Sequence, residues 1–256
     1  MKKNFQDLVE LSKLLRSPGG CPWDREQKLE TLRPYIIEEA YEVVQAIEQK
    51  DKDDIIEELG DLFFQVIFAS QIASEDGEFN IEEVVDRLHS KLVSRHPHVF
   101  GEEKAKDAQE AIKIWHKQKL KEKSRKRRLL EIPRTMPSLL RAHRVGEKAS
   151  QVGFDWKSAE QVLPKVKEEL MELEAEIKNQ NKQGIEKEFG DLVFSIVNLG
   201  RHLKLDSEST AHKAIDGFIN RFSKVEDKAE ERGKELSGLT IEEMDELWEE
   251  VKREGA

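Results

Sequence analysis

The stretch YIIEEAYEVVQAIEQKDKDDIIEELGDLFFQVIF, residues Tyr35–Phe68, mixes apolar and acidic residues with the period of an α-helix. Apolar residues recur every three or four positions in two runs, Ile36, Ala40, Val43 and Ile47, then Ile55, Leu59, Leu62 and Val66. This spacing gives each run one apolar stripe, as in an amphipathic helix. The polar interval QKDKDD between the runs predicts a turn. The stretch therefore predicts a helical hairpin whose two stripes pack against each other.

Five acidic residues accompany the stripes, namely Glu38, Glu39, Glu42, Glu58 and Asp61. At about 100° per residue, Glu39 and Glu42 lie about 60° and 120° to one side of the first stripe. Glu58 and Asp61 lie at the same two angles beside the second stripe. When the hairpin closes stripe to stripe, the two carboxylate pairs converge at one edge of the interface, whereas Glu38 lies further round its helix.

Four converging carboxylates repel one another, and removal from water raises the cost of each charge. A hard divalent cation relieves this repulsion, and Mg²⁺ prefers oxygen ligands and commonly bridges to phosphates. The pattern predicts a Mg²⁺ site, with Glu38 as a supporting group or a base that orients water. The alternative interpretation is that these acids are solvated flanks of amphipathic helices. A di-iron site is disfavoured, because none of the seven histidines follows a glutamate by three positions.

The same acidic pattern recurs 130 residues later, at Glu168, Glu169, Glu172, Glu188 and Asp191. Each copy reads E-E-x-x-E, then fifteen residues, then E-x-G-D. The likeness extends outward, because CPWD pairs with VGFDW, KLVSRH with GFINRF, and WHKQK with WEEVK. Two copies at identical spacing favour a functional cause over chance. The second polar interval is NQNKQG, in which Gly184 is predicted to be a turn or cap residue.

The repeat predicts an all-α fold of two tandem domains, residues 1–120 and 138–256, joined by a basic, proline-containing linker over residues 121–137. Further helices are expected over residues 4–15, 81–92, 103–121, 208–233 and 241–253, while RHPHVF is expected to be a short extended piece. Only 14 Gly and 7 Pro among 256 residues argue against a turn-rich β protein.

Charge and composition exclude several classes of protein. The net charge of −10 disfavours a general nucleic-acid binder, and the linker run KEKSRKRR, which favours that alternative, lacks interleaved aromatic residues. No apolar run approaches the ~20 residues of a membrane span, and Asp7 and Glu10 stand where a signal peptide needs an apolar stretch. The single Cys21 excludes an internal disulfide and has no nearby histidine in sequence to activate it. We therefore expect a cytoplasmic protein that engages neither membrane nor nucleic acid.

Basic and aromatic residues beside the acids favour phosphate chemistry. Lys91 and Arg95 are one helical turn apart, and so are Trp115 and Lys119. We predict that they hold a polyphosphate while Trp23 or Trp115 contacts a base, although such residues are more often solvated or in a core. No G-x-x-x-x-G-K-[ST], G-x-G-x-x-G or G-x-S-x-G motif occurs, which excludes a motor of the P-loop type.

At this point the motifs CPWD, EEAYEVV, EELGDLFFQV and RHPHVF followed by W-x-x-x-K resemble those of the MazG nucleoside triphosphate pyrophosphohydrolases. VGFDW, EELMEL, EFGDLVFSIVN and NRF resemble the second half of that family, so the resemblance covers almost the whole chain. It implies Mg²⁺-dependent hydrolysis of nucleoside triphosphates, with broad base selectivity, to the monophosphate and pyrophosphate. It also implies a homodimer whose hairpins form four-helix bundles, and a role in house-cleaning of damaged nucleotides or in control of nucleotide signalling pools.

Carried onto this sequence, the resemblance assigns the metal to eight carboxylates, Glu39, Glu42, Glu58, Asp61, Glu169, Glu172, Glu188 and Asp191. Glu38 and Glu168 become the catalytic groups, as base or orienter of the water that attacks the α-phosphorus. Substrate binding is assigned to Trp23, Lys91, Arg95, Trp115, Lys119, Arg221, Trp248 and Lys252. The chain departs from the family at Gln27-Lys28-Leu29, where Gln-Thr-His is frequent, and at Gly217, which stands opposite Lys91.

Two other classes of protein stay open as alternatives. One is a regulatory protein that binds Mg²⁺ and nucleoside triphosphate without turnover, and the other is a helical scaffold whose acids only confer solubility. The complete acidic sets favour the enzyme, since binding alone rarely needs both a full set of ligands and Glu38.

Overall fold

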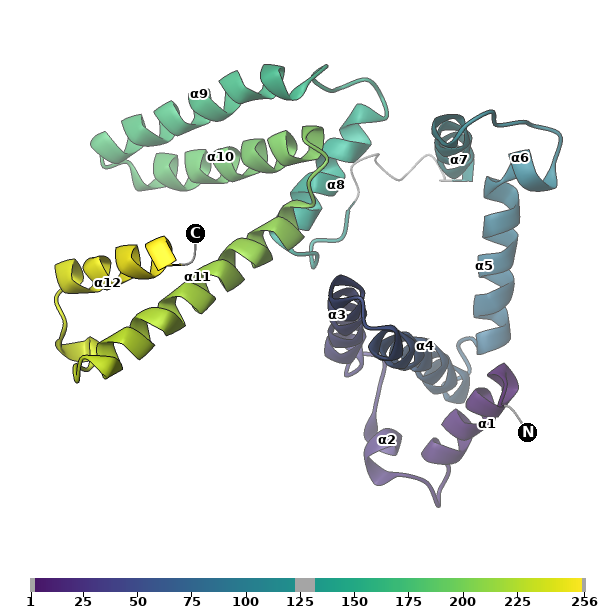
Figure 1. Ribbon diagram of the computed structural model, residues 1–256. Coiled ribbons are helices and arrows are strands. Elements are labelled where there is room, and N and C mark those ends of the chain that lie inside the picture. The colour runs from purple at the N-terminus through teal and green to yellow at the C-terminus, as the bar shows by residue number, and fades with distance from the viewer. Residues whose placement is uncertain (1–2, 123–131, 255–256) are drawn as a thin grey trace. The chain divides into compact units, whose positions relative to one another are not determined.

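The computed structural model describes residues 3–122 and 132–254, and all the regular structure within these residues is helical (Figure 1). This confirms the predicted all-α fold. The chain divides into two compact units, residues 1–124 and 125–256, which we describe separately. The basic stretch of the predicted linker lies mainly on residues 123–131, outside the described residues, so the linker and the domain limits stay predictions.

The first unit consists of α1 (Phe5–Arg16), α2 (Pro22–Glu26), α3 (Arg33–Gln49), α4 (Lys52–Glu75), α5 (Ile81–Arg95), α6 (Pro97–Phe100) and α7 (Ala108–Glu122). Its central feature is the predicted hairpin of α3 and α4. Beneath the hairpin, Phe68 and Ile72 of α4 are buried with Leu32, and α1 packs on α4 through Val9 and Ile67. The long helix α4 is thus the element on which both the hairpin and the core are built.

The second unit consists of α8 (Ser138–Ser150), α9 (Ala159–Lys178), α10 (Lys182–His202), α11 (Ser207–Glu231), a 3₁₀ turn η1 (Leu236–Gly238) and α12 (Ile241–Glu254). Here α9 and α10 form the hairpin, which Figure 1 shows as two long antiparallel ribbons. A separate core joins α11 to α12 through Val225, Ala229, Leu247 and Val251.

The two hairpin turns match residue for residue across the repeat. Lys50 and Gln180 adopt left-handed backbone conformations, with φ of 60° and 53°. Lys50 is the C-cap of α3, whereas Gln180 follows Asn179, the C-cap of α9. Asp51 and Asn181 follow as N-caps, and their side chains accept hydrogen bonds from backbone amides in the first turn of α4 and α10. The turns are therefore shorter than the polar intervals QKDKDD and NQNKQG suggested.

The prediction that Gly184 is a turn or cap residue is wrong. It is the third residue of α10, and its amide donates to Oδ1 of the N-cap Asn181 at 3.3 Å. A Cβ at this position would meet the carboxylate of Glu176 on α9, a flexible side chain that would have to move.

Three further details differ from expectation. RHPHVF is not extended, because Pro97 opens the short helix α6, and proline is well suited to a first helical position. The helix expected from residue 103 begins at Ala108. Helix α8 was not expected. It lies against α10, and buried Gly146 permits the approach, since a Cβ there would lie 3.0 Å from Nε of Arg201.

The segment between α8 and α9 is fixed to the end of α10 by a charged group. Asp155 pairs with the guanidinium of Arg201 and, at 3.0 Å, with Nε2 of His202. Burial acts to raise the pKa of Asp155, but hydrogen bonds from these two partners outweigh it and lower that pKa. The DW pair of the second repeat therefore has a structural role at Asp155.

The stripe-to-stripe packing that the sequence predicts for the first hairpin is only partly present. Val43 is buried, but Ile36, Ile47, Leu59 and Val66 each expose between 39 and 54% of their surface. The second hairpin is similar, with Ile177 54% exposed. The expectation was wrong for these residues because a two-helix hairpin covers only one flank of each amphipathic helix.

Candidate functional site

The first hairpin brings three of its predicted metal ligands together. Glu39 of α3 and Glu58 and Asp61 of α4 present carboxylate oxygens that all lie within 4.8 Å of one another. Glu58 and Asp61 are three residues apart, so they project from one face of α4 toward α3. We call Glu39, Glu42, Glu58 and Asp61 the first acidic cluster.

Burial, and after it the neighbouring carboxylates, raise pKa values in the first cluster. Burial raises the pKa of Glu39, and the carboxylates of Asp61 and Glu42 add to it, against a hydrogen bond from Nε2 of Gln65 at 3.2 Å. Burial also raises the pKa of Glu58, followed by the charges of Glu42 and Asp61. Glu42 therefore acts on both neighbours although it lies outside the closest set of three.

The second hairpin repeats this arrangement with a difference. Glu169 and Glu172 of α9 and Glu188 of α10 have carboxylate oxygens within 4.8 Å of one another. Burial raises the pKa of Glu172, and the charges of Glu188 and Glu169 raise it further. With Asp191 these residues form the second acidic cluster, but Asp191 lies outside the set of three.

Two lysines lie within the second cluster. Nζ of Lys165 is 2.8 Å from Glu168 and 2.7 Å from Glu169, and Nζ of Lys187 is 2.8 Å from Glu188 and 3.0 Å from Asp191. Hydrogen bonds to these carboxylates raise the pKa of both ammonium groups. Neither lysine was predicted to belong to the site, although each stands four residues before an acid of the cluster, which is a visible signal in the sequence.

The donor chemistry of both clusters fits a hard divalent cation such as Mg²⁺. Each cluster offers carboxylate oxygens from two helices at a spacing that one ion can span. In addition, Oε2 of Glu188 is buried and has no hydrogen-bond partner among the described residues, while the whole side chain is only 12% exposed. A buried carboxylate oxygen without a partner is costly, and a cation would satisfy it.

The predicted catalytic glutamates lie beside the clusters. Glu38 is exposed on α3 and lies outside the set of three acids, and Glu168 is paired with Lys165. Their roles as water-orienting groups stay predictions.

Basic and aromatic residues predicted to bind substrate form one group in each unit. In the first, the guanidinium of Arg95 and Nζ of Lys119 lie 5.3 and 4.7 Å from the centre of the Trp115 ring. In the second, the guanidinium of Arg221 lies 4.8 Å from the Trp248 ring centre. The Arg95 and Arg221 contacts are cation–π contacts between two helices of a unit, whereas Lys119 and Trp115 both lie on α7.

The remaining predicted substrate-binding residues are more dispersed. The half-exposed ring of Trp23 meets Tyr35 edge to face at 5.7 Å, Lys91 is exposed on α5, and Lys252 pairs with Glu249 at 3.0 Å. Their assignment to substrate stays a prediction.

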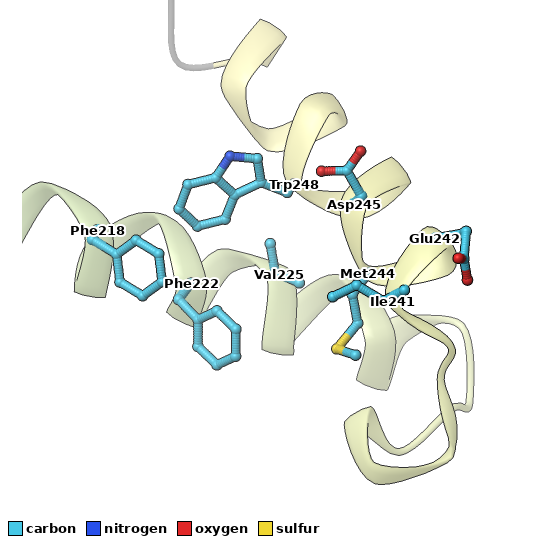
Figure 2. Close-up of a pocket in the computed structure, with 8 residues that line it drawn as sticks. All are labelled: Phe218, Phe222, Val225, Ile241, Glu242, Met244, Asp245 and Trp248. Atoms are coloured by element: carbon cyan, nitrogen blue, oxygen red, sulfur yellow. The ribbon is translucent and has the colours of Figure 1, made fainter. Parts of the chain in front are cut away.

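Figure 2 shows the residues that line an apolar pocket between α11 and α12, beside Trp248. The volume of this pocket is about 420 Å³. The rings of Phe218 and Phe222 line it from α11, and Trp248 and Asp245 line it from α12. Phe218 and Phe222 were not predicted to belong to a site, although their spacing of four residues beside Arg221 places them on one helix face.

Among the helices of residues 3–122 and 132–254, none combines the length and the apolar content needed to cross a lipid bilayer.

Comparisons with known proteins agree with the repeat. Residues 27–100 and 157–228 match the family profile of the MazG nucleotide pyrophosphohydrolase domain, and these two ranges contain both acidic clusters. A Thermotoga maritima protein named nucleoside triphosphate pyrophosphohydrolase/pyrophosphatase MazG is 48% identical, over 97% of this chain and 95% of its own. The nucleoside triphosphate pyrophosphohydrolase of Escherichia coli K12 is 41% identical, over 96% of each chain.

A crystal structure of a mazG-related protein from Thermotoga maritima is 31% identical and covers 45% of this chain and 98% of its own, with a TM-score of 0.39. The family profile covers more than half of this chain, and the two full-length relatives exceed 40% identity. The chain therefore belongs to the MazG family and carries the MazG domain twice.

Proposed function

We propose that this protein is a nucleoside triphosphate pyrophosphohydrolase, which cleaves its substrate to a nucleoside monophosphate and pyrophosphate in the presence of Mg²⁺. The observation that carries the proposal is the pair of acidic clusters, one in each MazG domain, whose carboxylates converge from two helices. The names of the two full-length relatives support the reaction.

The acidic residues of each cluster would hold the cation: Glu39, Glu42, Glu58 and Asp61 in the first, and Glu169, Glu172, Glu188 and Asp191 in the second. When bound, Mg²⁺ supplies charge neutralisation at the phosphates and at the pyrophosphate leaving group. Glu38 directly precedes Glu39 on α3, and Glu168 directly precedes Glu169 on α9. We assign to them the orientation of the water that attacks the α-phosphorus and acceptance of its proton.

The cation–π groups would hold the rest of the substrate. Arg95 and Lys119 in the first unit, and Arg221 in the second, supply positive charge for phosphates beside the faces of Trp115 and Trp248. An aromatic face stacks on any base, so this arrangement supports broad base selectivity. Trp23, Lys91 and Lys252 complete the proposed substrate-binding set.

The exposed parts of the apolar stripes support assembly into a homodimer. Ile36, Ile47, Leu59 and Val66 lie on one hairpin, and the first unit covers them only in part. Packing of two such hairpins into a four-helix bundle would bury them and exclude water from the neighbouring acids.

A cytoplasmic location also stays our proposal.

The test is release of pyrophosphate from several nucleoside triphosphates, measured with Mg²⁺ and again with EDTA. We expect release that requires Mg²⁺ and is abolished by the double substitution Glu42→Gln with Glu172→Gln. The matched control is Asp86→Asn with Glu226→Gln, which removes two exposed charges outside the clusters and is expected to retain activity. Unchanged release from the Glu42/Glu172 variant would refute the site, whereas nucleotide binding without release would favour a regulatory protein.

A further inference from the structure

We propose that Lys187 makes the second acidic cluster a weaker cation site than the first, because its ammonium group occupies Glu188 and Asp191 in ion pairs that a cation must displace. This inference rests on the proposed function, since it takes both clusters to be cation sites.

The structural basis is the different position of the fourth acid in the two hairpins. In the first cluster, Asp61 belongs to the set of oxygens within 4.8 Å of one another. In the second, the corresponding Asp191 is outside that set, and its Oδ2 is 3.0 Å from Nζ of Lys187. The same ammonium group is 2.8 Å from Oε1 of Glu188, which is a member of the set. One lysine thus contacts one ligand and draws another away.

The sequence difference that produces this contact is a single reversal of charge. Lys187 stands directly before Glu188 and four residues before Asp191, and the matching position in the first hairpin is Glu57. On a helix, a lysine reaches an acid four residues away, whereas a glutamate at that position repels it. The exchange therefore removes a negative charge beside the cluster and adds a positive one.

A second lysine strengthens the contrast without explaining the position of Asp191. Lys165 pairs with Glu168 and Glu169 on α9, where the first hairpin has Tyr35. No ammonium group is recorded within 4.0 Å of Glu39, Glu58 or Asp61 among the described residues. The two ammonium groups offset half of the negative charge that the four acids of the second cluster carry.

The exposure of Lys187 indicates that it weakens binding and does not prevent it. Its side chain is 66% exposed, and ion pairs at such positions are weak because water competes for both partners. A divalent cation can therefore displace the ammonium group into solvent. The expected result is that the two clusters of one chain fill at different cation concentrations, the first before the second.

The experiment measures Mn²⁺ binding to the full-length protein without nucleotide, from the electron paramagnetic resonance signal of free Mn²⁺. Two double variants, used below as backgrounds, each leave one cluster able to bind the cation. Glu39→Gln with Glu58→Gln leaves the second cluster intact, and Glu172→Gln with Glu188→Gln leaves the first. We expect the first cluster to bind Mn²⁺ at least about tenfold more tightly than the second, given the size of short-range Coulomb interactions near a protein surface.

The decisive comparison exchanges the charges at the two matching positions, Lys187 in the second hairpin and Glu57 in the first. With only the second cluster intact, Lys187→Glu is expected to tighten Mn²⁺ binding about tenfold, and Lys187→Gln by less. With only the first intact, Glu57→Lys is expected to weaken it by a similar factor, and Glu57→Gln by less. Lys182→Glu makes the same change of charge at the start of α10, away from the ion pairs, and is expected to have a much smaller effect.

Circular dichroism melting identifies any variant that fails to fold, in which case the milder glutamine substitution decides. If Lys187→Glu and Lys187→Gln leave the affinity unchanged, or if Lys182→Glu changes it equally, the inference is wrong while the proposed function stands. If neither background binds more Mn²⁺ than the variant with all four glutamines, the proposed metal sites and this inference fail together.

Discussion

At the scale of single residues, the acidic clusters combine carboxylates that the fold destabilises with lysines that relieve some of them. Glu39, Glu58 and Glu172 have raised pKa values, for which burial is the largest cause and neighbouring carboxylates the next. Such residues are unfavourable to stability unless something else requires them. Their recurrence in both hairpins is what a cation site explains and a solubilising surface does not.

These pKa shifts predict how stability depends on pH in the absence of cation. A carboxyl group whose pKa is raised in the folded state destabilises the fold when it is ionised, and this destabilisation is relieved as the pH falls through the raised pKa. In EDTA at pH 7.5, Glu39→Gln should therefore raise the melting temperature by a few degrees.

The advantage of Glu39→Gln should shrink as the pH is lowered toward 5, because the wild-type carboxyl group becomes neutral as well. With Mn²⁺ present the order should reverse, since the variant lacks a ligand. Thermal melting at several pH values checks both statements. A variant that is less stable than the wild type in EDTA at pH 7.5 would contradict the assigned pKa shift.

The sequence predicted the convergence of the acids because it depends on helical angles alone. Glu39 meets Glu58 and Asp61 across the first hairpin as the 100° rule predicts, but Glu42, which the same rule places at this edge, lies outside the set. The exclusion of Asp191, whose Oδ2 lies 3.0 Å from Nζ of Lys187 on the same helix, was not predicted. The outcome depends on side-chain conformations that a residue pattern does not specify.

At the scale of elements, the hairpin is the unit that the repeat duplicates. Three consecutive positions match between the two turns: a left-handed residue, the N-cap of the second helix, and the first residue of that helix. They are Lys50, Asp51 and Lys52 in the first hairpin, and Gln180, Asn181 and Lys182 in the second. Periodicity and capping signals were enough to place these helices. Helix α8, which packs on α10 near Gly146, was missed although its own residues are strongly amphipathic.

The uncovered side of the hairpins leads to a prediction about assembly. Ile47 and Ile177 occupy matching positions in the repeat, and each is 54% exposed within the single chain. If the hairpins form four-helix bundles between two chains, Ile47→Arg with Ile177→Arg places charges in the buried interface and should convert the dimer to a monomer.

Sedimentation equilibrium measures the mass of the assembly directly. The control is Leu14→Arg, which introduces the same charge at an exposed leucine of α1 and should leave the dimer intact. A wild-type protein with the mass of one chain, or a double variant that remains dimeric, would rule out assembly through the hairpins.

At the scale of the whole molecule, two MazG domains in one chain have diverged while keeping their acids. All eight predicted ligands are present, yet the first cluster has Tyr35 and Glu57 where the second has Lys165 and Lys187. The aromatic groups differ too, because Gly217 stands opposite Lys91, and Phe218 packs on Trp248 at 5.0 Å. The chain is thus a pair of related sites with different electrostatic surroundings.

The central claim is that both acidic clusters are cation sites. Equilibrium titration of Mn²⁺ into the full-length protein tests this claim most directly. The comparison is a variant in which Glu39, Glu58, Glu169 and Glu188 are all changed to glutamine, after circular dichroism has shown that it is folded. We predict saturable binding to the wild type that Mg²⁺ displaces, and no saturable binding to the variant. Equal binding to both proteins, or no binding to either, would contradict the assignment.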